Sequence, residues 1–178
     1  LARSRKADPE NRLLWRMNRR RLEFEALRDA LLAVSGQLDV TMGGPSVNAF
    51  AGFSRRRTIY GFIDRQDVPA MLRDFDFPDP AASSPQREST TVPPQALFLM
   101  NNSFGIDAAR RLSQRRDVVS ISDADARLDR LYEIAYGRLP ADRERALAKE
   151  FLGPQPDSTS WLRFTQALLM ANEFAFID

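Results

Sequence analysis

The sequence predicts a mainly α fold, an irregular helical bundle with a long Pro-rich loop and at most a short β element near residues 58–63. Three observations lead to this fold class. Apolar residues recur at spacings of three and four between good helix caps, as on the buried face of a helix. Only one short run is rich in β-branched and aromatic residues. Residues 77–85 hold three prolines and show no periodic pattern.

Asp8-Pro9 predicts the start of the first helix, because Asp is a favoured N-cap and Pro fits the first helical turn. From there apolar residues follow at gaps of three, four and seven, and Gly36 is a natural helix end. We therefore expect one long helix over about residues 9–35. Its apolar stripe consists of Leu13, Met17, Phe24, Leu27, Leu31 and Val34.

The best candidate strand is the run TIYGFI at residues 58–63. A single strand is not stable alone, so we expect it to pair with a short partner near Val40 or to run as extended backbone in the core. Residues 69–75 are expected to form one or two helical turns. Residues 77–91 are expected to form a long irregular loop, which is typical of functional or disordered segments and could mark an internal domain boundary.

The second half of the chain predicts a series of helices. Asp123 and Asp157 are favoured N-caps, and Gly137 and Gly153 are natural helix ends. The short connection between the last two helices predicts an antiparallel pair. The expected helices cover residues 91–101, 103–115, 123–136 and 140–152, with a last one from residue 158.

Length and composition describe one folded unit. The 178 residues suit a single helical domain over residues 1–178 or the C-terminal subdomain of a larger domain. The 43% hydrophobic and 28% charged residues are ordinary for a folded soluble protein, and no apolar run is long enough to span a bilayer. The chain begins with Leu1 and shows no export signal, so we expect a processed product or an excised fragment.

The absence of cysteine and histidine excludes several chemistries for this chain. Disulfides, thiolate nucleophiles, His-based triads, the usual zinc sites and the haem attachment motif all need one or both residue types. A metal site would have to use oxygen ligands only, as calcium and magnesium sites do. With no catalytic motif either, the sequence leans towards a protein that is not an enzyme, and it predicts no cofactor or metal in this chain.

Basic residues concentrate in two places. Residues 1–30 hold nine Lys/Arg against five Asp/Glu, and Arg55, Arg56 and Arg57 form a second cluster. This pattern suggests binding of nucleic acid or another polyanion through the basic N-terminal helix. Acids are interleaved with the cations, however, and no stacking aromatics accompany them. That mixture favours a solvated helix face and argues against nucleic acid as the partner.

Acidic residues gather near the start of the long loop. Asp74, Asp76 and Asp79, with Asp64 and Asp67 nearby, could form a calcium site or an acid/base pair. Their spacing lacks the glycine and the terminal Glu of a calcium loop. Capping and turn-forming roles are therefore favoured for these residues.

Two tryptophans, Trp15 and Trp161, lie on predicted amphipathic helices. We expect both to be core anchors, because large aromatic side chains dominate core packing. A sugar-stacking cleft between them is the alternative interpretation.

Several long strings occur together and in the order typical of one known family. They are DPENRLLWRMNRRR (8–21), MGGP (42–45), RTIY (57–60), FDFPDP (75–80), TTVPPQALFLMN (90–101) and NEF (172–174). Together they resemble the planctomycete C-terminal domain of unknown function found in large exported proteins that also carry a planctomycete-type cytochrome c domain. The resemblance runs from about residue 8 to the end of the chain. Residues 131–174 are also similar, more weakly, to helical tails of other secreted bacterial proteins.

The resemblance implies that this chain is the C-terminal part of that domain, because the family has a further stretch upstream. It implies an extracytoplasmic location and, as partners, other domains of the parent protein. Haem is implied only for another domain of that parent. The family has no established activity, so the resemblance transfers no catalytic residue.

Polar residues within these strings form our candidate site. They are polar for a pure core, and we expect a network of arginine and carboxylate groups that orders the long loop. The candidate cluster consists of Arg57, Arg65, Asp76, Asp79, Arg87, Thr90, Thr91, Gln95 and Asn101. The favoured function is a non-catalytic interaction or structural module. The alternatives are a carboxylate-based polysaccharide-binding or polysaccharide-degrading site, and polyanion binding through the N-terminal helix.

Overall fold

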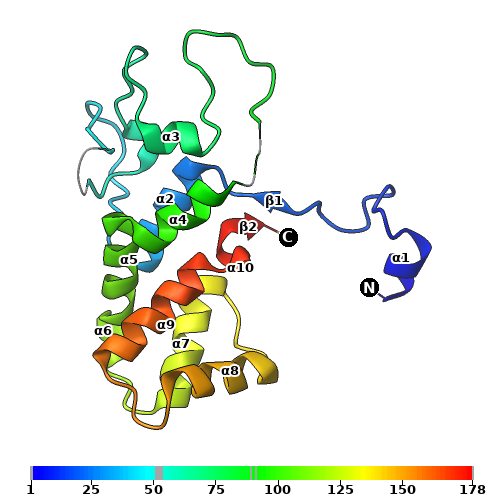
Figure 1. Ribbon diagram of the computed structural model, residues 1–178, viewed down its shortest axis with the longest axis vertical. Coiled ribbons are helices and arrows are strands. Elements are labelled where there is room, and N and C mark those ends of the chain that lie inside the picture. The colour runs from blue at the N-terminus through cyan, green and yellow to red at the C-terminus, as the bar shows by residue number, and fades with distance from the viewer. Residues whose placement is uncertain (1, 51–53, 89, 91, 178) are drawn as a thin grey trace.

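A computed structural model describes residues 2–50, 54–88, 90 and 92–177 (Figure 1). Within these residues 52% are helical, and ten α-helices accompany one 3₁₀ helix and two short strands, which confirms the mainly α fold. The α-helices are α1 (Ala2–Ala7), α2 (Phe24–Val34), α3 (Ala70–Asp74), α4 (Pro93–Asn101), α5 (Ser103–Ser113), α6 (Arg116–Val119), α7 (Ala124–Tyr136), α8 (Asp142–Leu152), α9 (Ser158–Met170) and α10 (Asn172–Ala175). The 3₁₀ helix is η1 (Thr58–Tyr60), and the strands are β1 (Arg20–Arg21) and β2 (Phe176–Ile177).

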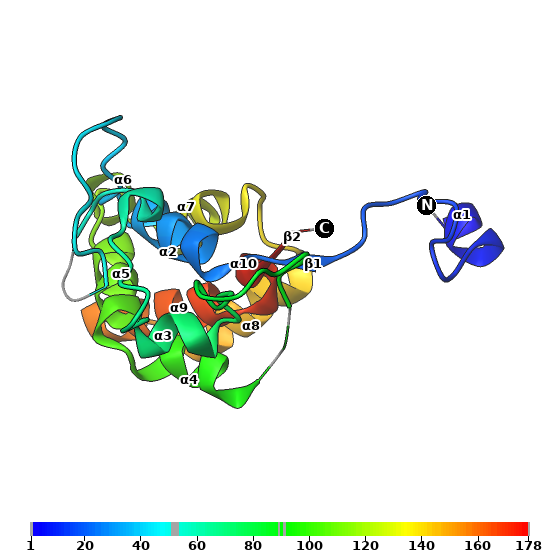
Figure 2. The same cartoon turned by 90° about the horizontal axis from the view of Figure 1, so that it is seen from above.

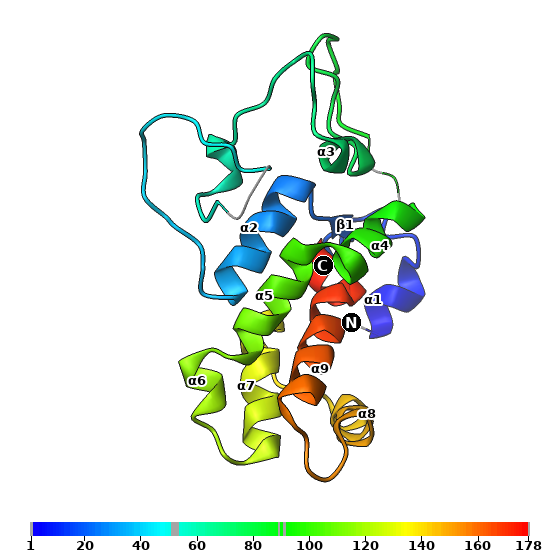
Figure 3. The ribbon, with the colours of Figure 1, turned by 60° about the vertical axis from the view of Figure 1, so that its left-hand side comes forward.

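The hydrophobic core draws its largest buried side chains from α2, α5, α7 and α9. Figures 1 and 3 show α5 and α9 side by side, and these two helices pack directly on each other. Leu27 and Leu31 of α2, Leu112 of α5, Leu131 of α7 and Leu169 of α9 are at most 2% exposed. Burial of each such side chain contributes about 1.5–3 kcal/mol. This apolar interior, rather than the small sheet, therefore stabilises the fold.

Caps and glycines place the C-terminal helices close to their predicted positions. Asp123 and Asp157 cap α7 and α9 by accepting hydrogen bonds from backbone N–H groups at 2.8 and 2.7 Å. Gly137 ends α7 in the left-handed conformation, with a φ of 70°. Helix α8 begins at Asp142, two residues after the predicted Pro140.

The predicted antiparallel pairing of the last two long helices is wrong. Figure 3 shows α8 end-on while α9 runs along the picture, so the two helices cross. Helix α8 still contacts α9, and ion pairs also tie it to α7. Arg145 meets Asp129 at 2.6 Å, and Lys149 meets Asp125 at 2.8 Å. These contacts hold α8 across the end of the bundle.

Three aromatic rings connect the segments on either side of the long loop. Phe24 begins α2, Phe75 follows α3, and Phe98 lies on α4. Their ring centroids lie 4.9 to 5.6 Å apart, at the tilted and edge-on angles that aromatic pairs prefer. This aromatic cluster fixes the positions of α3 and α4 and so provides a floor for the loop.

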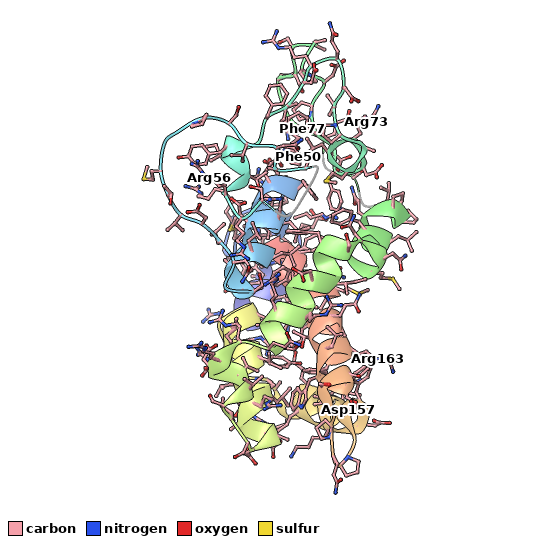
Figure 4. The ribbon with its side chains drawn as sticks, turned by 90° about the vertical axis from the view of Figure 1, so that its left-hand side faces the viewer. Phe50, Arg56, Arg73, Phe77, Asp157 and Arg163 are labelled. Atoms are coloured by element: carbon pink, nitrogen blue, oxygen red, sulfur yellow. The ribbon has the colours of Figure 1, made fainter. Side chains whose placement is uncertain are left out.

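The long loop is irregular over residues 77–88, as predicted, and α3 before it occupies the predicted helical turn. Figure 4 shows Arg73 and Phe77 at the loop end of the molecule, with Asp157 and Arg163 at the opposite end. After the loop, α4 and α5 meet at Asn102. The side chain of Asn102 caps α5, so the predicted break between the two helices is confirmed.

The predicted long helix over residues 9–35 is wrong in its first half. The Asp8 carboxylate accepts hydrogen bonds from the N–H groups four and five residues later, and Asn11 adopts a left-handed conformation with a φ of 56°. Helical backbone cannot continue through such a residue. The chain therefore turns after α1 and becomes helical again only at α2, whose end near Gly36 is as predicted.

Because this helix is absent, Trp15 is not a core anchor. Its indole Nε1 donates to the carbonyl oxygen of Asp8 at 2.8 Å, and the Arg16 guanidinium lies 5.5 Å from its ring centroid. Trp161, by contrast, is 5% exposed and belongs to the core, as predicted. Trp161 lies on α9, whereas Trp15 lies between α1 and β1, in the segment that projects from the helical body in Figure 1, so the two do not line a shared sugar-stacking cleft.

The candidate strand at residues 58–63 forms no ladder. Its first three residues form η1, and Gly61 makes a single parallel bridge with Val47, which is within the short β element that the sequence allowed at most. The Asp29 carboxylate accepts hydrogen bonds from Thr58 N at 2.8 Å and Thr58 Oγ1 at 2.6 Å, which favours the tight turn. The partner expected near Val40 is wrong, because Asp39 bridges to Arg56 and the described part of residues 58–63 bridges to Val47. Regular pairing within the described residues occurs elsewhere, where β1 lies antiparallel to β2.

Candidate functional site

Four predicted site residues meet at the base of the long loop. They are Asp76, Arg87, Thr90 and Gln95, and Arg21 joins them from β1. We call these five residues the loop cluster. The sequence did not indicate Arg21, because the pattern placed it inside a continuous helix.

Asp76 links the two ends of the loop. It follows α3 in a left-handed conformation with a φ of 59°, which Asp tolerates better than most residues. Its carboxylate accepts hydrogen bonds from Thr90 N at 2.8 Å and Thr90 Oγ1 at 2.7 Å. Burial opposes ionisation, but the bonds from Thr90 and Gln95 and the charge of Arg21 outweigh it and lower the pKa of this carboxyl.

Gln95 is the buried centre of the loop cluster, with 2% of its surface exposed. Its side-chain oxygen accepts from the Arg21 guanidinium and from Val92 N at 3.2 Å. Its amide nitrogen donates to the carbonyl oxygen of Asp74 at 2.8 Å. One side chain thus joins β1, the end of α3 and the start of α4. Burial lowers the pKa of Arg21, and the charge of Asp76 opposes this effect.

Arg87 holds the C-terminal part of the loop against α2. Its Nε and one terminal nitrogen donate to the carbonyl oxygens of Asp76 and Phe75 at 2.9 and 3.1 Å. Its other terminal nitrogen lies 3.0 Å from the Glu25 carboxylate and 3.3 Å from that of Glu23. A planar guanidinium suits this arrangement because its donors point in fixed directions. Neither glutamate was predicted as part of the site.

The remaining predicted site residues lie elsewhere. Arg57 approaches Asp29 at 3.9 Å, next to η1. Arg65 and Asn101 are exposed, and Asp79 accepts a hydrogen bond from Ala81 N at 2.9 Å within its own turn. Thr91 lies outside the described residues. The predicted set therefore does not form one network, although Asp76, Arg87, Thr90 and Gln95 do.

A cleft of about 590 Å³ opens beside the loop cluster. Its walls combine four arginines with three acids, so it is polar and of mixed charge. Besides members of the loop cluster, it is lined by Arg19, Arg20, Leu22, Glu23, Phe75, Gln86, Glu88 and Phe176. This volume is within the range of small-molecule sites, but such sites are usually more apolar.

The loop cluster is poorly arranged for catalysis or metal binding. Both Asp76 oxygens already accept hydrogen bonds, and Arg87 is engaged with carbonyl and carboxylate oxygens. Among the described residues no three acidic side chains converge to hold a metal ion, so the predicted calcium alternative finds no ligand set there. The side chains of the loop cluster instead hold the two ends of the loop together.

The fold and the loop cluster define a mainly helical domain with an internally bonded polar network. No helix in the described part of the chain is both long and apolar enough to cross a bilayer. The chain belongs to the family PSD1, described as protein of unknown function (DUF1553), whose family model matches residues 2–152. No curated protein and no solved structure matches the chain.

Proposed function

We propose that this chain is a non-catalytic helical interaction module of a large exported, haem-linked protein, used for assembly or ligand presentation. The observation that carries the proposal is the structural role of Asp76, whose two carboxylate oxygens both accept from Thr90 and so join the two ends of the loop. Each oxygen keeps a second lone pair, but the described residues bring no group of three acids together that could share a metal ion with it. The resemblance supports the setting: an extracytoplasmic location, with haem in another domain of the parent.

The loop cluster gives such a module a defined surface. Three side chains, Asp76, Arg87 and Gln95, bond to backbone groups at both ends of the loop, and Arg87 also reaches α2. A long loop that is held at its base loses less conformational entropy when a partner binds it. The other domains of the parent protein are the partners that this proposal favours.

Polysaccharide binding is the second candidate, because the polar cleft beside the loop cluster is large enough for a sugar unit. Arg20 is largely exposed and Glu23 about half exposed, and they pair with each other at 3.5 Å. A ligand there could accept a hydrogen bond from Arg20 or donate one to Glu23. This candidate is a binding function and needs no catalytic carboxylate.

Thermal unfolding separates the two candidates. The wild type, Asp76→Ala and an Arg20→Ala/Glu23→Ala variant are heated with and without neutral polysaccharides, calcium or magnesium. The module proposal expects no shift with any ligand and early melting of Asp76→Ala. A ligand that binds only the folded chain must raise the melting temperature. A rise with a polysaccharide that the double variant loses would support the second candidate. A rise with calcium that Asp76→Ala abolishes would overturn the module proposal.

Asp79→Ala is the matched control for these measurements. Asp79 is exposed, and among the described residues it bonds only within its own turn. The Asp79→Ala variant should therefore melt close to the wild type. Early melting of both aspartate variants would show that the loop is sensitive at many positions and that the loop cluster has no special role.

A further inference from the structure

Residues 2–19, which we call the arm, project from the helical body. Figures 1 and 2 show the arm leaving the body at β1, with α1 at its far end. The antiparallel pairing of β1 with β2 anchors it at this point. Arg19 strengthens the anchor, since its guanidinium lies 5.1 Å from the ring centroid of Phe176.

The arm has an ordered turn although it lacks a hydrophobic core. Asp8 caps the turn through two backbone N–H groups, and the Trp15 indole donates to the Asp8 carbonyl oxygen. Asn11 is 3% exposed and donates from its side-chain nitrogen to the Arg16 carbonyl and the Asn18 side chain at 2.8 and 2.7 Å. These polar bonds shape the arm, so its apolar residues are not needed to hold it together.

Three large apolar side chains of the arm point into solvent. Leu13, Leu14 and Met17 are 83%, 71% and 55% exposed, and we call them the apolar tip. Leu14 adopts a left-handed conformation with a φ of 53°, which costs a Leu residue about 1–2 kcal/mol. Strained conformations of this kind cluster at functional sites. The exposed tip is therefore the part of the arm that would gain most from burial against a partner.

The arm is also strongly basic. It holds six Lys/Arg and two Asp/Glu, a net charge of +4, whereas the whole chain has 26 Lys/Arg and 24 Asp/Glu. The rest of the chain therefore carries a net charge of −2. Arg3, Arg5, Lys6 and Arg12 form no ion pair with any described residue. These cations therefore precede the apolar tip in the chain, three of them on α1 and Arg12 directly before Leu13.

We propose that the arm binds an anionic lipid surface. Leu13, Leu14 and Met17 would enter the boundary between headgroups and acyl chains, and the flanking cations would contact lipid phosphates. Such peripheral binding combines buried apolar area with attraction of Lys and Arg to anionic lipids. Trp15 fits the same surface, because its ring is amphipathic and tryptophan is enriched at membrane interfaces. This inference goes beyond the module proposal and does not depend on the loop cluster.

The apolar tip favours lipid over the other anionic partner considered for this segment. Nucleic-acid binding needs cations that follow a phosphate backbone, and two adjacent leucines with 71% or more exposure contribute nothing to that contact. Lipid binding uses both features of the arm at once. Figure 2 shows the arm projecting away from the helical body.

Vesicle co-sedimentation tests the proposal. The chain is mixed with phosphatidylcholine vesicles and with vesicles that contain about one third phosphatidylglycerol, at low and high salt. We expect binding to the anionic vesicles only, and weaker binding at high salt because salt screens the charges. Leu13→Ser/Leu14→Ser should lower the partition coefficient about tenfold, since the two side chains supply much of the buried area. Arg12→Glu/Arg16→Glu should abolish binding.

The controls change matched residues outside the arm. Leu97→Ser/Met100→Ser removes two exposed apolar side chains from α4, and Arg65→Glu/Arg143→Glu reverses two exposed cations of the body. Both should bind vesicles nearly as well as the wild type. Equal losses in the arm variants and these controls would overturn the proposal, because the chain would then bind through its general charge or hydrophobicity.

Trp15 provides a second readout of insertion. It is partly exposed, whereas Trp161 is 5% exposed, so a blue shift of emission and quenching by brominated lipid should report Trp15 alone. Trp15→Phe should remove both signals while binding persists. Three outcomes would each overturn the proposal: no binding to anionic vesicles, duplex DNA binding that Leu13→Ser/Leu14→Ser leaves unchanged, or concentration-dependent dimerisation that this variant abolishes.

Discussion

Replacing Asp76 tests whether the loop cluster stabilises the fold. Asp76→Ala removes both acceptors for Thr90 but keeps a Cβ atom in the left-handed conformation. A typical hydrogen bond contributes about 0.5–1.5 kcal/mol, and these two are solvent-exposed, which places them in the lower half of that range. We therefore expect a loss of about 1–2 kcal/mol. For a chain of this length the melting temperature should fall by about 3–6 °C.

Two further variants separate the hydrogen bonds from the backbone strain. Asp76→Gly loses the same bonds but removes the strain at a φ of 59°. Its free energy of unfolding should therefore be about 1 kcal/mol higher than that of Asp76→Ala. Asp76→Asn keeps one acceptor and should lie between the wild type and Asp76→Ala. Urea unfolding gives these free energies. Limited proteolysis within residues 77–88 should accelerate in the order of the losses.

The pH dependence follows from the lowered pKa of Asp76. A carboxyl whose pKa is lower in the folded state stabilises the fold above its unfolded pKa, which is about 3.9. That contribution disappears as pH falls through the folded-state pKa. The stability difference between the wild type and Asp76→Asn should therefore be constant near neutral pH and shrink below about pH 4. Unchanged urea midpoints and unchanged proteolysis for Asp76→Ala would refute the whole line of reasoning.

Four other substitutions make independent predictions. Gln95→Leu should cost about 2–3 kcal/mol in urea unfolding, because the buried donors and acceptor that Gln95 now satisfies lose their partner. Arg28→Met should cost about 3 kcal/mol by the same assay, since Arg28 is 3% exposed and its guanidinium donates to the carbonyl oxygens of Ser54 and Arg56. Gly137→Ala should lower stability by about 1 kcal/mol because φ is 70°, and calorimetry will detect the lower melting temperature. Asp117 has its pKa lowered by hydrogen bonds from Arg115 and Arg130. Its stabilising effect is present above about pH 4 and is lost in acid, so a pH series should show Asp117→Asn approaching the wild type at low pH.

Local chemistry explains which parts of the fold could be predicted from sequence. Asp123 and Asp157 cap their helices by accepting from N–H groups three residues later, so the signal lies within a few neighbouring residues. The short helices α6 and α10 were not predicted, because four residues carry too little periodicity to be recognised.

The long helix and the candidate strand depart from their predictions for a different reason. Apolar spacing from Leu13 onward is helical, but the side chains of Asp8 and Asn11 bond backbone groups and stabilise a turn instead. The strand predicted at residues 58–63 has strong β propensity. The Asp29 carboxylate on α2 nevertheless accepts two hydrogen bonds from Thr58 and favours the tight turn of η1. Propensity is a weak prior where such a tertiary contact competes.

The candidate site could be predicted in part. Asp76, Arg87, Thr90 and Gln95 are close together in the chain, and the long loop must bring its two ends near each other, so their meeting was foreseeable. Arg21 was not foreseeable, because its contact with Gln95 spans 74 positions and depends on the turn after α1. Patterns in neighbouring residues do not predict contacts between residues so far apart in the chain.

The pairing of β1 with β2 has a kinetic consequence. Arg20 lies opposite Ile177, which is 157 positions later in the sequence, so this ladder closes nearly the whole chain into a ring. Closing a ring of that size has a large entropic cost, and only two residue pairs form in return. The ladder should form last during folding and open first from the native state. Amide exchange at Leu22 N, which donates to the Ala175 carbonyl oxygen at 2.8 Å, is therefore expected to be far faster than exchange within α5 or α9.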